Sequence, residues 1–145
     1  MQKEHLGFFS KDKLAVISLI LVGSFSWVAT MFRSGLFYSY GLGFWGPHAH
    51  DGIWHIALAE SLAKGSNDMP TFAGSGLQNY HLGYDILLAL LHKVTTINIS
   101  TLYFQVLPLM FAILIGFLTY VVVFQWKRST NKAFWSVFFV YFAGS

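Results

Sequence analysis

The residues best suited to chemistry lie in one short stretch, where histidines flank a single carboxylate. They are His48, His50, Asp51 and His55, in a chain with only six histidines and six acidic residues. Asp51 and His55 are four positions apart, so a helix would place them on the same face. At that spacing an imidazole and a carboxylate can share a hydrogen bond, bind one metal ion or act together on a substrate.

Two simpler interpretations of this stretch stay open beside the catalytic one. His48, His50 and His55 with Asp51 are ligand types that suit zinc, although their spacing matches no established zinc signature. Asp51 alone also suits the N-cap of a helix over 52–64, a role that stabilises a helix by about 1 kcal/mol. The three histidines are therefore candidate metal ligands, and Asp51 is a candidate for a structural role, a chemical role or both.

A second group of polar residues follows farther along the chain. Tyr80, His81, Tyr84 and Asp85 interleave aromatic rings with an imidazole and a carboxylate. The simplest interpretation is a belt of tyrosines at a membrane surface. That interpretation explains Tyr80 and Tyr84 but gives no role to His81 and Asp85, so both join the candidate site.

The elements that must position these residues are those of a membrane protein. The chain is 55% hydrophobic and 10% charged, whereas soluble proteins carry about 25% charged residues. Residues 14–32 and 102–124 carry no charge, and each is long enough to span a bilayer, which takes about 20 apolar residues. A third, truncated span is expected over 133–145, which indicates the N-terminal part of a longer protein. Pro108 is expected to kink the second span.

The distribution of basic residues predicts the orientation. They gather before the first span and after the second, and the positive-inside rule places both groups in the cytoplasm. The predicted order is a cytoplasmic N-terminus over 1–13, a long extracytoplasmic loop over 33–101 and a short cytoplasmic loop over 125–132. Helices are expected in the long loop near 52–64 and 84–95. The predicted fold class is all-α: a polytopic transmembrane protein of the plasma membrane, with short interfacial helices in its outer loop.

Composition also excludes several classes of function. The chain has no cysteine, so it forms neither disulfides nor thiolate metal sites. Its net charge of +3 comes from scattered lysines and arginines without a basic run. A basic balance of this kind reports membrane topology rather than nucleic-acid binding, so no nucleic-acid partner is expected.

The arrangement resembles the GT-C class of membrane glycosyltransferases, which use lipid-phosphate-linked sugars. Those enzymes have many transmembrane helices and a long first outer loop, which carries an acidic motif near its start and helices along the membrane surface. The stretch 50–55 (HDGIWH) is similar to that acidic motif, and 79–91 (NYHLGYDILLALL) is similar to the end of the loop. In one departure, many members have paired acidic residues, whereas Asp51 stands alone between histidines.

The resemblance implies a hexosyltransferase that moves a sugar from a polyprenyl-phosphate donor to an extracytoplasmic acceptor. It implies that Asp51 is the base that takes the proton of the acceptor hydroxyl. Hydrogen-bond donors would hold the departing lipid phosphate, and aromatic rings would contact the sugar. This substrate-binding group comprises Arg33, Trp54, His55, Tyr80, His81 and Asp85. The implied partners are the lipid-linked sugar donor and membrane lipids, and a divalent metal is compatible with the chemistry without being required.

Two other functions compete with glycosyl transfer. A non-enzymatic transporter or scaffold subunit would use the outer loop for binding or assembly, but a transporter is expected to have polar or broken spans. The two spans expected here are almost free of ionisable residues. A metal-dependent membrane hydrolase would use His48, His50 and His55 as ligands.

Overall fold

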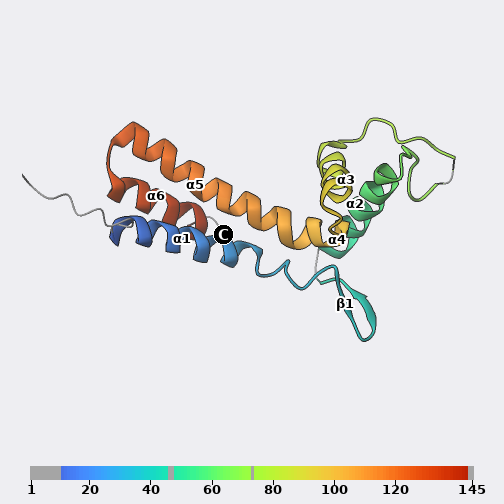
Figure 1. The fold of residues 1–145 in the computed structure, drawn as a ribbon, viewed down its shortest axis with the longest axis horizontal. Coiled ribbons are helices and arrows are strands. Elements are labelled where there is room, and N and C mark those ends of the chain that lie inside the picture. Colours follow the sequence, from blue (N-terminus) through green and yellow to red (C-terminus); the bar gives the residue numbers. More distant parts are fainter. Residues whose placement is uncertain (1–10, 46–47, 73, 144–145) are drawn as a thin grey trace, which may run out of the picture. The chain divides into compact units, whose positions relative to one another are not determined.

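The computed structural model describes residues 11–45, 48–72 and 74–143. These residues are mostly helical (Figure 1). They belong to two compact units, of which one is Ala29–Pro108 and the other joins Met1–Val28 to Leu109–Ser145. Each unit has its own core, and the residues predicted to do chemistry lie in Ala29–Pro108.

The unit formed by the two ends of the chain packs the helices α1 (Lys11–Val28), α5 (Leu107–Lys127) and α6 (Thr130–Phe142) alongside one another (Figure 1). Its core joins apolar residues of α1 to Val137 and Tyr141 of α6. The buried hydroxyl of Tyr141 donates to the carbonyl of Ala112 at 2.7 Å and lies 2.9 Å from the hydroxyl of Ser24. Tyr141 therefore links all three helices through groups that need a partner when buried.

One helix in the described part of the chain, Ile99–Lys127, is long and apolar enough to cross a membrane. It contains the expected span over 102–124 and consists of three consecutive pieces, which are α4 (Ile99–Thr101), η1 (Leu102–Val106) and α5. The expected spans over 14–32 and 133–145 fall on α1 and α6, which do not reach the same length and hydropathy within the described residues.

The helix that contains the expected first span ends earlier than predicted. α1 stops at Val28, and turns lead from there to Gly35. The side-chain amide of Gln105 donates to the carbonyl oxygens of Phe32 and Ser34, at 3.1 and 2.8 Å. Gln105 thus supplies hydrogen bonds to backbone carbonyls that lie outside a helix.

The expected kink at Pro108 takes the form of a widened turn. Residues Leu102–Val106 form a π-helix, and the amide of Leu107 donates to the carbonyl of Leu102. Proline has no amide hydrogen, so an α-helical bond from Pro108 to the carbonyl of Phe104 is impossible. A short π-helical segment inside an α-helix bends it locally and re-aims its side chains.

The unit Ala29–Pro108 packs α2 (His48–Ala63) against α3 (Gly83–Thr95) and against the start of the long helix. Its core consists of Ala59, Leu88, Ile99, Leu102 and Leu107. α3 agrees with the helix predicted over 84–95 to within one residue. α2 begins at His48, before the predicted start at 52.

One expectation is corrected here. Because α2 begins at His48, Asp51 lies within its first turn and is not its N-cap. The described residues are mostly helical, as predicted, but they also include a short hairpin in which Leu36–Tyr38 (β1) pairs antiparallel with Gly41–Gly43 (β2). Glycine at both ends of β2 and the positive φ of Gly41, 116°, permit this tight hairpin.

Candidate functional site

The centre of the candidate site is a pair of side chains from α2 and α3. The Nδ1 atom of His55 lies 2.8 Å from the Oδ1 atom of Asp85. The Asp85 side chain is fully buried, and the His55 side chain is 26% exposed. Two residues from the separate polar groups of the sequence therefore meet in space.

The pairing fixes which ring nitrogen of His55 carries a proton. An ionised carboxylate only accepts hydrogen bonds, so Nδ1 of His55 is the donor. Nε2 makes no hydrogen bond to a described residue, and it is not an enclosed atom. His55 thus directs Nδ1 to the buried carboxylate and leaves Nε2 available for a substrate.

The buried carboxylate is held by this one side chain. Oδ2 of Asp85 is enclosed and makes no hydrogen bond within the described residues. Asp85 lies in the first turn of α3, where the helix dipole favours negative charge. Buried carboxylates are costly unless paired, so His55 is the main partner that the fold supplies to Asp85.

Aromatic rings surround His55 on several sides. Its ring stacks on Tyr103 with centroids 5.8 Å apart and an interplanar angle of 23°, and it meets the ring of Tyr84 edge-on at 6.4 Å. The indole nitrogen of Trp54 donates to the hydroxyl of Tyr80 at 2.8 Å, and the Tyr80 ring lies 6.3 Å from that of His55. The imidazole is therefore fixed in orientation by stacking as well as by its bond to Asp85.

Tyr84 is a protonated member of this group. Burial, together with the neighbouring phenol of Tyr103 and carboxylate of Asp85, raises the pKa of Tyr84 to about 12. The hydroxyl of Tyr84 therefore stays protonated to a higher pH than that of an ordinary tyrosine.

Close packing of α2 on the π-helical segment positions Tyr103. A Cβ atom placed on Gly52 would lie 2.5 Å from Cζ of Phe104, and one on Gly35 would lie 2.6 Å from Cδ2 of the same ring. Phe104 is fully buried. The two glycines thus allow Phe104 to fill the space between α2 and the base of the hairpin, and the neighbouring Tyr103 reaches His55.

Asp51 occupies a different environment on the same helix. Its side chain is 81% exposed, and Oδ1 lies 3.5 Å from Nδ1 of His50, which is itself 97% exposed. Asp51 is four positions before His55 on α2, about one helical turn away. The site therefore combines an accessible carboxylate, Asp51, with a fixed imidazole, His55, on one helix.

Two predicted substrate-binding residues, Arg33 and His81, make no described contact with His55 or Asp85. The guanidinium of Arg33 lies 4.9 Å from the centroid of the Trp45 ring, in a cation–π contact. The His81 side chain is exposed.

Sequence reasoning missed Tyr103, Phe104 and Gly52. For Tyr103 the available signal was a tyrosine beside Gln105 in an otherwise apolar run just before Pro108.

Two of the candidate metal ligands, His50 and His55, contact different carboxylates. The described residues contain no group of three histidine, aspartate or glutamate side chains that could hold a metal ion. His50 is exposed beside Asp51, and Nδ1 of His55 is engaged with Asp85. The side chain of His48 lies outside the described structure.

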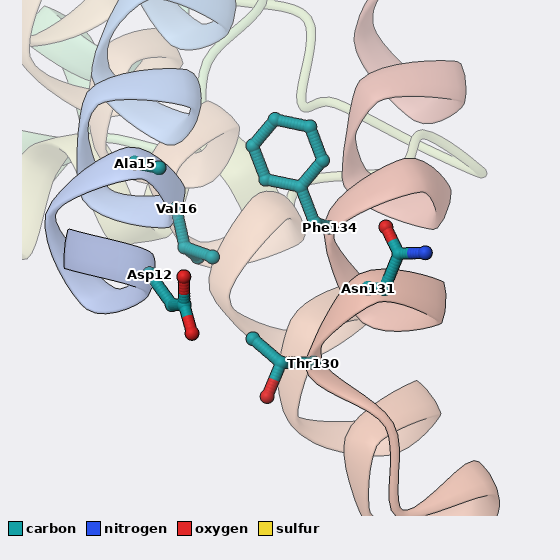
Figure 2. A pocket seen from close by; sticks show the side chains of 6 residues that line it. All are labelled: Asp12, Ala15, Val16, Thr130, Asn131 and Phe134. Atoms are coloured by element: carbon teal, nitrogen blue, oxygen red, sulfur yellow. The ribbon is translucent and has the colours of Figure 1, made fainter. Parts of the chain in front are cut away.

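A hollow of about 310 Å³ lies in the other unit, between α1 and α6 (Figure 2). Its described lining has one ionisable side chain, that of Asp12. None of the residues predicted to do chemistry lines this hollow. The lining residues are Asp12, Ala15, Val16, Thr130, Asn131 and Phe134.

The chain matches no protein-family model, no curated protein and no solved structure.

Proposed function

We propose that the protein is a membrane glycosyltransferase that moves a sugar from a polyprenyl-phosphate donor to an acceptor hydroxyl outside the cytoplasm. The observation that carries this proposal is the His55–Asp85 pair, whose accessible Nε2 lies among aromatic rings on the same helix as the exposed carboxylate of Asp51. The resemblance of 50–55 and 79–91 to GT-C enzymes supports it.

The position of the site along the long helix suits a lipid-linked substrate. Tyr103 is near the beginning of Ile99–Lys127, the helix that could cross a membrane. The first turns of such a helix lie at the level of the lipid headgroups. A polyprenyl tail would lie in the bilayer while its phosphate and sugar reach the site. In this orientation 33–101 is extracytoplasmic and the N-terminus is cytoplasmic.

The reaction forms a bond between the acceptor oxygen and the anomeric carbon while the bond from that carbon to the phosphate oxygen breaks. Asp51 takes the proton from the attacking hydroxyl. His55 in its protonated form donates from Nε2 to the departing phosphate, and Asp85 balances the charge of the imidazolium. Trp54 and Tyr80, which are held together by a hydrogen bond, offer aromatic surface to the sugar.

The test is transfer by the full chain in lipid vesicles, with polyprenyl-phosphate mannose and polyprenyl-phosphate glucose as donors and a membrane lipid extract as the source of acceptor. We expect Asp51→Asn to lower the rate of transfer by about 100-fold or more, the usual effect of removing a general base. Glu60→Gln is the matched control, because Glu60 is a partly exposed carboxylate on the same helix.

Each other outcome contradicts a defined part of the proposal. Near-normal transfer by Asp51→Asn would remove Asp51 as the base. Equal loss in Asp51→Asn and Glu60→Gln would indicate a general effect of charge on α2. If the unaltered chain consumes neither donor, glycosyl transfer from these donors is wrong.

A further inference from the structure

The hairpin that follows α1 exposes an unusual amount of apolar surface. No charged residue occurs over 34–45, the segment that contains β1 and β2. Four large side chains of the hairpin are exposed even though they are apolar or aromatic. They are Leu36 at 38%, Phe37 at 81%, Tyr40 at 68% and Leu42 at 39% exposure.

The aromatic side chains of the hairpin are ordered on one another. Tyr38 and Tyr40 stack with ring centroids 5.3 Å apart and an interplanar angle of 2°. The Tyr38 ring also lies 5.0 Å from that of Trp45. Arg33, the nearest charge before the hairpin, lies over the other aromatic partner, Trp45. The exposed surface is therefore a fixed set of rings with a cation at its edge.

The base of the hairpin is attached to the beginning of the long helix. The Gln105 side chain donates to the carbonyls of Phe32 and Ser34. The amide of Gly35 donates to the carbonyl of Gly43 at 2.8 Å, and Gly35 lies against Phe104. The depth of the hairpin in a membrane is thus set by the depth of residues 104–105.

That depth corresponds to the membrane interface. The uncharged run 102–124 within the helix Ile99–Lys127 has 23 residues, and about 20 apolar residues cross the hydrocarbon core of a membrane. Gln105 is the fourth residue of this run. It therefore lies near the boundary between headgroups and hydrocarbon.

We propose that the hairpin 34–45 is a membrane-contact element, which inserts Phe37 and Tyr40 among the lipid headgroups and upper acyl chains. Aromatic residues without nearby charge are the residues that favour this depth. Arg33 keeps its guanidinium at the polar level while its stem lies along apolar surface. The partner is the lipid surface, because Gln105 attaches this uncharged hairpin to the beginning of the helix that could cross a membrane. This inference does not rest on the proposed glycosyl transfer.

The absence of cysteine in the chain allows a direct test. A single cysteine at Ser39, in the turn of the hairpin, is labelled with the polarity-sensitive dye NBD, and the full chain is reconstituted into phosphatidylcholine vesicles. Phe72→Cys is the matched control, because Phe72 is also an exposed aromatic residue, at 66%, in a different loop of the same unit. Phe117→Cys reports the long helix itself.

We expect NBD at position 39 to show blue-shifted emission and at least a twofold higher sensitivity to brominated lipids than NBD at position 72. A label at 39 that behaves like the label at 72 overturns the proposal, provided that the label at 117 is quenched by lipid. If the label at 117 also reports water, the long helix does not cross the membrane and the depth argument is wrong. As an independent variant, Phe37→Ser with Tyr40→Ser should reduce quenching at 39.

Discussion

At the scale of single residues, the buried carboxylate of Asp85 places the strongest demand on its surroundings. Its Oδ2 atom has no hydrogen bond within the described residues, and Oδ1 depends on His55. Hydrogen bonds to charged groups contribute about 1.5–3 kcal/mol. Removing the imidazole of His55 would therefore leave a buried carboxylate that water does not reach.

We predict that His55→Ala lowers the free energy of unfolding by about 2–3 kcal/mol, since it leaves Asp85 buried without its partner. His92→Ala is the matched control. Nδ1 of His92 is also hydrogen-bonded, but to the carbonyl of Ile97 at an exposed position, so its loss is expected to cost about 1 kcal/mol or less. Denaturant unfolding in detergent micelles, followed by circular dichroism, measures both.

A double variant separates the pair from each residue alone. If His55 and Asp85 interact as the geometry indicates, adding Asp85→Asn to His55→Ala should recover part of the loss, because no buried charge is then left unpaired. Strictly additive effects of the two substitutions would contradict a direct interaction.

At the scale of elements, the site depends on how closely α2 approaches the π-helical segment. Gly52 permits this approach, because any larger residue meets the buried ring of Phe104. Tyr103, next in the chain to Phe104, stacks on His55. The distance between the backbones of α2 and the π-helical segment thus determines whether the imidazole of His55 is held in one orientation.

We predict that Gly52→Ala destabilises the protein by about 1–3 kcal/mol, the usual cost of overpacking. The sign of the change in unfolding free energy is informative, because alanine stabilises a helix by about 1 kcal/mol relative to glycine when nothing obstructs its side chain. Phe104→Leu should relieve the clash, so that Gly52→Ala is less harmful in that background. A stabilising effect of Gly52→Ala in the unaltered chain would show that α2 and Phe104 are not in close contact.

The elements themselves were predictable to different degrees. The apolar run over 102–124 and the helix near 84–95 follow from local patterns of hydropathy and from turn residues at their ends, so the sequence predicts both. The sequence predicted a kink at Pro108 but not the π-helical turn that precedes it, and it placed the start of α2 four residues too late. The hairpin at 36–43 was missed because its two strands have only three residues each, which is too short for a recognisable alternating pattern.

At the scale of the whole molecule, composition predicts apolar helices, but it says little about which distant residues meet. His55 and Asp85 were each identified as candidates, yet their pairing spans a loop rich in turn residues. Two separate polar groups of the sequence converge because α2 packs on α3. Such a convergence depends on the relative rotation of two helices, which local sequence patterns do not encode.

The packing of α2 on α3 should also affect the stability of the whole molecule at alkaline pH, through the phenol of Tyr84. Burial first, and then Tyr103 and Asp85, raise the pKa of Tyr84 to about 12, whereas an unfolded tyrosine has a pKa of about 10. Between these values the unfolded chain loses the proton that the folded chain keeps, so the free energy of unfolding falls as pH rises from about 10 to about 12. Below about pH 10 both states are protonated, and the contribution is fully present.

We predict a shallower alkaline decline for Tyr84→Phe than for the unaltered chain, measured as unfolding free energy against pH in micelles. Identical slopes would mean that water reaches Tyr84 and that the aromatic group around His55 is open.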